Sequence, residues 1–491
     1  MTRLVPDALL ERVARDPAAP AVHARSATWS RGELLAAADG LACALAGEGL
    51  GEGSRIAALL DDDAPAVALV HAARRLGAVH VPLNRRATAA ELHDQLTRVS
   101  ADALLHDKAN GELASTSASD GPTTHRIEAL LAGAPCGPSP QLRAEIDLDA
   151  PATIVFTSGT TGQPKGAILT HDNHRASAHA WAGLLRARPG QRWLACLPLF
   201  HVAGLAIITR TTRWGADLHV LDAFDADVVS EAIDDGVTHL SLVPVQLSEL
   251  LDARDERPPP VSLQAVLLGG GPIPVELLQR ARAARFPVLT TYGMTETGSG
   301  VASGGADEAT RRDPLAGRPL PGVRLRIEPD GAADGGGEIL VHGEMVFAGY
   351  LDDPGATDVV LRDGWLHTGD MGTIDAEGLL RVLDRREDLI ISGGENVYPA
   401  EVEAVLAGHP AVAEAVVIGE PNAHWGTVPV AYLVPAAGAT PDEAEVRRYC
   451  RERLAAYKAP ARIEWLERLP RNAFGKVQRR ALRQQPSTPG S

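Results

Sequence analysis

The sequence predicts an α/β fold: a large amino-terminal domain of mainly parallel βαβ sheets, ending in a small β section, and then a small α+β domain. Three observations carry this prediction. The 491 residues exceed the size at which one hydrophobic core keeps growing. Short apolar runs alternate with amphipathic helical patterns from about residue 54 to 290. After residues 330–343 the pattern changes to short strands and glycine turns, and a compact α+β pattern begins near residue 387.

In the first region, short runs rich in β-branched and apolar residues predict the strands. A Ser/Thr-rich stretch, 114–124, and the segment 252–260, which ends in three prolines, are expected to be surface loops. The predicted strands are 153–157, 192–197, 238–243, 264–268 and 286–292.

In the last region, helical periodicity alternates with β-branched runs. The final residues, 484–491, are rich in Ser, Pro and Gln and are expected to be disordered. The predicted order is helix 399–409, strand 412–419, strand 428–434 and helix 441–457.

Composition excludes several classes of function. A net charge of −16 without a Lys/Arg-rich run argues against a nucleic-acid partner. The four cysteines are scattered, without metal-ligand spacing, which is typical of a reduced, cytoplasmic protein. Neither a signal peptide nor an apolar run of membrane-spanning length is expected.

Lysine is scarce in this chain. Of 47 basic residues only Lys108, Lys165, Lys458 and Lys476 are lysine, so each is a position where arginine is a poor substitute. A compact ammonium on a flexible stem reaches places that a planar guanidinium cannot. Lys165 and Lys476 lie in glycine-containing motifs, whereas no role is assigned to Lys108.

The run TIVFTSGTTGQPKGAILTH, residues 153–171, predicts an anion site. An apolar strand leads into hydroxyl and glycine residues and Lys165, after which a helix is expected. Glycines let backbone N–H groups approach phosphate oxygens, and the lysine adds charge. The run is not a Walker motif, because Gly166 rather than Ser or Thr follows the lysine.

From this run onward the sequence resembles the adenylate-forming superfamily of acyl- and aryl-CoA synthetases, peptide-synthetase adenylation domains and luciferases. The resemblance covers essentially the full length and recurs in order at four further motifs, 292–297, 364–370, 384–403 and 469–476. The chain is most similar to the o-succinylbenzoate–CoA ligases of menaquinone biosynthesis. The resemblance implies Mg²⁺, ATP and CoA as partners and an acyl-AMP intermediate.

The resemblance also implies roles for individual residues. Tyr292 would stack on adenine, Thr295 would bond a phosphate oxygen and Glu296 would hold Mg²⁺, a cation that takes carboxylate and phosphate oxygens. Asp370 and Arg385 would contact the ribose, although an Asp–Arg surface pair is the alternative. The implied ATP- and AMP-binding residues are Thr157, Ser158, Gly159, Thr160, Thr161, Gly162, Lys165, Gly270, Gly271, Tyr292, Gly293, Thr295, Asp370 and Arg385.

By the same resemblance, residues 1–386 bind ATP and the acid, and residues 387–491 form a mobile domain with the catalytic Lys476. Glu387 stands at the hinge position, where Asp or Lys is more usual. Gly393 and Gly394 would line the channel for the pantetheine arm of CoA. Lys476 would act in adenylation only, together with Lys165 and Glu296.

The acid is expected to lack an ammonium group, because the segment 197–216 contains no acidic residue to pair with one. An o-succinylbenzoate substrate would keep a second carboxylate, which a planar arginine suits. Arg210 is the first candidate and Arg213 the second, while solvated helix-face arginines are the alternative. His201 would gate the acyl pocket and Gly269 would form part of its floor.

Other interpretations stay open at this point. A medium-chain fatty-acid or aryl-acid CoA synthetase would have a purely apolar pocket, and a non-catalytic nucleotide-binding protein would show no ATP–pyrophosphate exchange. A homo-oligomer is compatible with the sequence. Pro470, Gly475 and Lys476 match the pattern at which related synthetases are inactivated by lysine acetylation, so a lysine acetyltransferase acting on Lys476 is a further expected partner.

Overall fold

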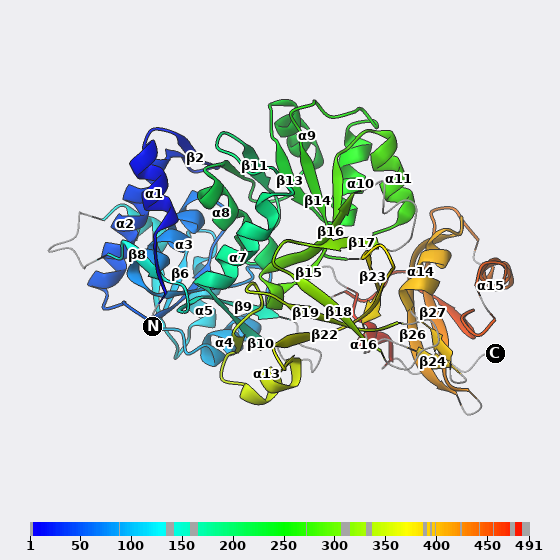
Figure 1. Cartoon of the computed structure of the whole chain (residues 1–491). Helices are drawn as coiled ribbons and strands as arrows, with labels where there is room; N and C mark the ends of the chain where they lie inside the picture. Colours follow the sequence, from blue (N-terminus) through cyan, green and yellow to red (C-terminus); the bar gives the residue numbers. More distant parts are fainter. Residues whose placement is uncertain are drawn as a thin grey trace. The chain divides into compact units, whose positions relative to one another are not determined.

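The computed structural model divides the chain into two compact units (Figure 1). The first comprises Met1–Leu325, Val341–His367 and Gly378–Leu380, and the second comprises Arg326–Leu340, Thr368–Glu377 and Arg381–Ser491. The structure describes residues 3–87, 89–133, 142–157, 165–271, 273–305, 315–329, 336–385, 390–392, 395–397, 399–422, 425–440, 442–454, 456–471 and 477–483.

The first unit contains a seven-stranded sheet in the order β20-β10-β9-β5-β4-β6-β7. Strands β9 to β7 along this order are parallel, and β10 runs antiparallel to both β9 and β20. Apolar side chains on both faces pack beneath helices, as a parallel sheet requires. The strands are β4 (Arg55–Leu59), β5 (Val79–Pro82), β6 (Ala103–His106), β7 (Thr123–Arg126), β9 (Pro151–Thr157), β10 (Lys165–Thr170) and β20 (Gly349–Tyr350). The helices around it are α2 (Arg31–Gly47), α3 (Ala64–Leu76), α4 (Ala89–Arg98), α5 (Gly111–Ser117) and α6 (Ile127–Leu131).

A second sheet of this unit runs in the order β17-β16-β15-β14-β13-β11-β12-β2-β3. Its strands from β15 to β2 are parallel, and β16, β17 and β3 are antiparallel to their neighbours. The strands are β2 (Pro20–His23), β3 (Thr28–Ser30), β11 (Arg192–Ala195), β12 (Asp217–Val220), β13 (His239–Leu242), β14 (Ala265–Leu268), β15 (Val288–Met294), β16 (Ser299–Gly305) and β17 (Leu315–Pro319). Its helices are α7 (His171–Ala182), α8 (Val202–Trp214), α9 (Ala226–Asp234), α10 (Pro244–Ala253) and α11 (Val275–Ala283), with the short 3₁₀ turn η1 (Thr295–Thr297). Further elements of the unit are α1 (Ala8–Arg15), the strand pair β1 (Leu4–Pro6) and β8 (Glu145–Asp147), α13 (Pro354–Val360) and β21 (Leu361–Arg362).

Local sequence explains where these helices begin and end. Helix α2 starts at Ser30, whose hydroxyl accepts the Glu33 N–H while the Glu33 carboxylate accepts the Ser30 N–H, a reciprocal cap. Helix α8 ends at Gly215, whose φ of 71° is a conformation that glycine adopts without a Cβ penalty.

The second unit carries most of β18 (Arg324–Pro329), β19 (Gly337–His342), β22 (Trp365–Ile374) and β23 (Leu380–Arg385). Its carboxy-terminal part is a five-stranded sheet with the helices α14 (Pro399–Ala407), α15 (Glu443–Arg451) and α16 (Arg479–Arg483). One apolar cluster joins that sheet to α14 and α15. The strands are β24 (Ile390–Ser392), β25 (Glu395–Val397), β26 (Val412–Asn422), β27 (Gly426–Pro435) and β28 (Arg462–Trp465).

The predicted α/β class and its mainly parallel sheets are confirmed, and each of the five strands expected in the first region is present. Two expectations were wrong in part. The Ser/Thr-rich stretch 114–124 contributes to α5 and β7 instead of being all loop, because Ala114 and Ser117 pack into the core. The last predicted helix ends at Arg451 rather than near residue 457.

The expected disorder of 484–491 and the domain boundary between 386 and 387 lie outside the described residues, and the boundary stays a prediction. Among the helices that the structure describes, none is both long and apolar enough to cross a membrane.

Candidate active site

Two antiparallel strands flank the predicted anion site. Strand β9 ends at Thr157 and β10 begins at Lys165, its partner in the antiparallel register. The expectation that a helix follows the loop directly was wrong, because β10 comes first and α7 starts only at His171. Ser158, Gly159, Thr160, Thr161 and Gly162 lie outside the described residues.

A tyrosine that the sequence did not mark links two of the predicted catalytic residues. The Tyr350 hydroxyl donates a 2.8 Å hydrogen bond to Oε1 of Glu296, and the Lys165 ammonium lies 5.0 Å from the centre of the same ring. Glu296 is 6% exposed, so its carboxylate is held in a fixed position. Burial, followed by the negative charge of Glu296, raises the pKa of Tyr350 and keeps the hydroxyl a hydrogen-bond donor.

Backbone pairing explains how Tyr350 reaches this place. In the register of β10 and β20, Ala167 pairs with Tyr350, and the Leu351 N–H donates to the Gly166 carbonyl at 2.8 Å. The Phe347 N–H donates to the Glu296 carbonyl at 2.9 Å. Tyr350 is one of six tyrosines, and only this non-local pairing distinguishes it from the others.

The predicted glycines near the ends of β14 and β15 differ in what a side chain would meet there. A Cβ at Gly269 would lie 2.2 Å from Oγ1 of Thr291, so close packing of neighbouring strands excludes a side chain there. Gly270 has a φ of 80°, whereas a Cβ at Gly271 would meet open space. At Gly293 a Cβ would lie 2.2 Å from the Ser299 carbonyl oxygen.

The two aromatic and hydroxyl candidates of the next motif sit where β15 ends. Tyr292, in β15 next to a register shift, and Thr295, which opens η1, are both partly buried. Thr295 shares η1 with Glu296, and Tyr292 lies four residues before Glu296 in the chain.

Helix α8 carries the predicted acyl-pocket residues. His201 stands at its N-cap position, with an exposed imidazole whose ring centre lies 4.5 Å from that of Phe200. Arg210, in the interior of the same helix, is 2% exposed. Its Nη2 donates to the Ser299 hydroxyl at 2.9 Å, which ties α8 to the strand that follows the Glu296 turn.

The surroundings of Arg210 are aromatic rather than acidic. Its guanidinium carbon lies 5.2 Å from the Trp181 ring centre and 5.6 Å from that of Trp193. Among the described residues its Nε has no hydrogen-bond partner, and no carboxylate acts on its charge. Burial lowers the pKa of Arg210 to about 9, the sign of a charge that lacks compensation.

Two other arginines, Arg254 and Arg213, differ from Arg210 in their surroundings. Arg254 is equally buried, but its Nη2 lies 3.0 Å from Oδ1 of Asp234. Arg213, the second candidate, is partly exposed in the last turn of α8, and burial followed by the charge of Arg74 lowers its pKa. Arg210 is therefore the better candidate for an anionic ligand.

In the second unit, Asp370 lies in β22 and is 8% exposed. The preceding backbone is fixed: the Gly369 N–H donates to Oε1 of Glu338 at 2.9 Å and the Asp370 N–H donates to the Thr368 hydroxyl at 3.1 Å. Arg385 is the last residue of β23, and its side chain lies outside the described part.

The described residues before and after Lys476 pair with each other through their backbones. Arg471 and Val477 form an antiparallel bridge, and the Gln478 N–H donates to the Pro470 carbonyl at 2.8 Å. Arg479 anchors the following turn to Glu403 through bonds of 2.7 and 2.8 Å. Lys476 itself, Glu387, Gly393 and Gly394 lie outside the described residues.

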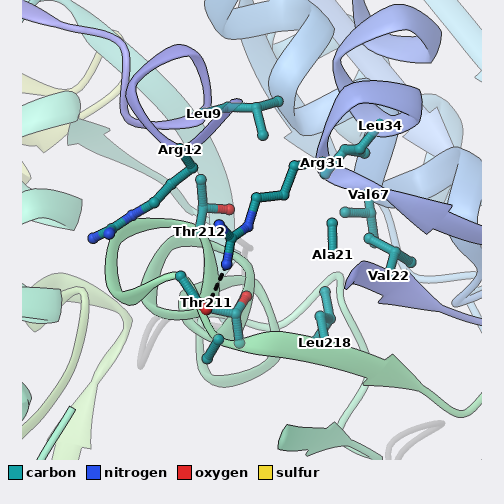
Figure 2. A pocket seen from close by; sticks show the side chains of 12 residues that line it. Leu9, Arg12, Ala21, Val22, Arg31, Leu34, Val67, Thr211, Thr212 and Leu218 are labelled. Atoms are coloured by element: carbon teal, nitrogen blue, oxygen red, sulfur yellow. Dashed lines mark hydrogen bonds between the residues drawn. The ribbon is translucent and has the colours of Figure 1, made fainter. Parts of the chain in front are cut away.

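A small cavity between α1, α2, β2 and the end of α8 contains none of the predicted site residues (Figure 2). The guanidinium of Arg31 donates to the Gly215 carbonyl at 2.9 Å, and that of Arg12 donates to the Arg213 carbonyl. These bonds satisfy carbonyls at the end of α8, so we assign the cavity to packing.

Comparison with known proteins decides the family. Residues 9–351 match the model of the AMP-binding enzymes, and residues 401–476 match that of the AMP-binding enzyme C-terminal domain. The chain belongs to the AMP-binding enzyme family. The predicted resemblance to adenylate-forming enzymes is thereby confirmed.

Several members of this family are similar over most of their length. A 2-succinylbenzoate–CoA ligase of Bacillus cereus (strain ZK / E33L) is 42% identical over 442 residues, 89% of each chain. The o-succinylbenzoate CoA synthetase of Bacillus subtilis with its acyl-adenylate intermediate has a TM-score of 0.92 and 38% identity, over 99% of each chain. The same synthetase with ATP and a magnesium ion has a TM-score of 0.91 and 38% identity, over 98% of this chain and 100% of that chain.

Proposed function

We propose that the protein is an AMP-forming acid–CoA ligase that converts 2-succinylbenzoate, ATP and CoA to 2-succinylbenzoyl-CoA, AMP and diphosphate. The similarity to named 2-succinylbenzoate–CoA ligases supports the reaction. The observation that carries the choice of acid is Arg210, a buried cation without a described carboxylate partner. A diacid that uses one carboxylate in the reaction supplies this partner with the other. A fatty acid or a monocarboxylic aryl acid does not.

In the first half-reaction, the succinyl carboxylate attacks the α-phosphorus of ATP, forming acyl-AMP and releasing diphosphate. Lys165 and Thr157 bind the phosphates, with Ser158, Gly159, Thr160, Thr161 and Gly162 of the same loop. Lys476 neutralises charge at the attacking carboxylate and the α-phosphate. One positioned charge of this kind contributes about 10²–10³ in rate.

Glu296 fits a role as magnesium ligand, because Tyr350 holds its carboxylate by one oxygen and a buried carboxylate suits a hard cation. Bound Mg²⁺ supplies charge neutralisation on the phosphates. Tyr350 acts as a positioning residue for Glu296 and as the ring beneath Lys165.

Four side chains are assigned to the nucleotide. Tyr292 stacks on the adenine, Thr295 bonds a phosphate oxygen and Asp370 accepts the ribose hydroxyls, helped by Arg385. Gly269, Gly270, Gly271 and Gly293 complete the walls of the adenine and acyl sites, and His201 gates the acyl pocket.

In the second half-reaction, the CoA thiolate attacks the acyl carbonyl of the mixed anhydride and AMP leaves. Residues 387–491 reorient about Glu387, withdrawing Lys476 and presenting Gly393 and Gly394 along the pantetheine arm.

Acetylation of Lys476 by a lysine acetyltransferase removes its charge and stops the first step alone. A cytoplasmic location fits the buried cysteines Cys43, Cys196 and Cys450, which form no disulfide with one another, and self-association into a homo-oligomer is compatible with both steps.

The test is acid-dependent AMP release with a panel of acids in the presence of CoA. We expect 2-succinylbenzoate to exceed benzoate, medium-chain fatty acids and malonate in kcat/KM. Equal or higher turnover of any of these acids would overturn the assignment of the acid. Absence of ATP–pyrophosphate exchange with every acid would overturn the assignment as a ligase.

A further inference from the structure

We propose that His23, Asp217 and His219 form a binding site for a divalent transition-metal ion, with Zn²⁺ as the expected occupant. The site is independent of the proposed ligase reaction and of its Mg²⁺. It uses residues of β2 and β12 that the reaction does not employ.

The pleat of two neighbouring strands brings these side chains together. His23 ends β2, and in the parallel pairing its register partner is His219 of β12. Asp217 lies two residues before His219 and therefore shares its face of the sheet. The intervening Val22 and Leu218 point to the opposite face, where they line the small cavity (Figure 2).

Distances between the donor atoms suit one ion. Oδ2 of Asp217 lies 3.1 Å from Nε2 of His23 and 3.2 Å from Nε2 of His219. One donor atom from each of the three residues lies within 4.8 Å of the other two. Ligands held about 2.0–2.1 Å from one Zn²⁺ lie roughly 3–3.5 Å from each other, which matches these distances. The two imidazole rings are stacked with centres 4.4 Å apart, so binding requires them to rotate until both nitrogens face the ion.

Hydrogen bonds alone leave this cluster incompletely paired. His219 and Asp217 form a hydrogen bond of 3.2 Å. Nε2 of His23 contacts Oδ2 of Asp217 at 3.1 Å without forming a hydrogen bond, and Oδ1 of Asp217 is buried without a hydrogen-bond partner among the described residues. A buried carboxylate oxygen without a partner is costly, and a metal ion bound by Asp217 and the two histidines would compensate its charge.

The donor set selects the class of metal. Two imidazole nitrogens and one carboxylate favour Zn²⁺ and neighbouring transition metals, whereas Mg²⁺ prefers oxygen ligands. The side chains of His23 and His219 are 34% and 25% exposed, so the cluster lies near the protein surface. Three protein ligands leave one tetrahedral position for a water molecule.

The experiment uses the tag-free full chain, stripped with a chelator and dialysed. Zn²⁺ is titrated in competition with a chromogenic chelator, and Co²⁺ is followed by its visible absorption as a probe of ligand geometry. We expect one ion per chain with a dissociation constant that is micromolar or tighter. Binding of Zn²⁺ only at millimolar concentration, or an octahedral all-oxygen Co²⁺ spectrum, would overturn the proposal.

Variants locate the ion. His219→Gln and Asp217→Asn should each weaken Zn²⁺ binding by more than about 100-fold, because loss of outer-shell partners alone already costs 10–100-fold. His179→Gln, an exposed histidine on α7, is the matched control and should bind Zn²⁺ like the wild type. Equal affinity of all these variants would refute the assignment.

Circular dichroism verifies that each variant is folded, and His23→Gln replaces any that is not. CoA-dependent AMP release separates this proposal from the ligase assignment. His219→Gln should retain that activity while losing Zn²⁺, so failure of either proposal is seen in its own assay.

Discussion

Replacing Arg210 by methionine should stabilise the free protein and impair its use of 2-succinylbenzoate. A pKa lowered from 12.5 to about 9 corresponds to about 5 kcal/mol of unfavourable free energy for the buried charge. Contacts with the Trp181 and Trp193 rings offset about 1 kcal/mol each, and the Ser299 hydrogen bond offsets about 1 kcal/mol more. A net cost of about 2 kcal/mol remains, and an uncharged, flexible methionine removes it.

In the assay, Arg210→Met should raise the free energy of unfolding of the ligand-free protein by about 2 kcal/mol, measured by calorimetry. Its kcat/KM for 2-succinylbenzoate should fall about 100-fold or more, because the second carboxylate loses its partner. With 4-phenyl-4-oxobutanoate, which lacks that carboxylate, the variant should equal or exceed the wild type.

The matched control is Arg254→Met. Arg254 is as buried as Arg210 but pairs with Asp234, so its loss should lower stability by about 1–3 kcal/mol and leave the ratio of the two acids unchanged. The reasoning is refuted if Arg210→Met destabilises the free protein as Arg254→Met does, or if it keeps the preference for the diacid.

Three further predictions concern other parts of the molecule. Tyr350→Phe keeps the ring beneath Lys165 but loses the hydrogen bond to Glu296. The rate of ATP–pyrophosphate exchange should therefore fall about 10–100-fold, and the reaction should require a higher Mg²⁺ concentration. An unchanged dependence on Mg²⁺ would contradict this role. Lys476→Arg should impair adenylation nearly as much as Lys476→Ala, about 10²–10³-fold, while both variants convert preformed acyl-AMP and CoA normally. Equal loss of both half-reactions would argue against a role of Lys476 in the first step alone. Burial lowers the pKa of His80 to about 4, so the folded state resists protonation and stability is lost as pH falls from 6.5 towards 4, by about 3 kcal/mol for this residue. His80→Gln should flatten the stability profile over this pH range, measured by urea unfolding, and an unchanged slope would exclude His80 as a source.

Local sequence determined much of this protein. Apolar runs predicted the positions of strands in the first unit. A strand buried on both faces of a parallel sheet needs such a run, whatever its place in the strand order. Glycines, hydroxyls and a rare lysine in one short run predicted an anion site, which stays a prediction, and the order of five motifs indicated the family. These signals are readable because each depends on neighbouring residues along the chain.

Only the tertiary structure decided which distant residues meet. Tyr350 reaches Glu296 because β20 pairs with β10, and His23 meets His219 because β2 lies beside β12. Arg210 is distinguished from Arg213 by lying between two indole rings brought from other elements. Strand order and helix packing arise from burial across the whole chain, so no short window of sequence contains them.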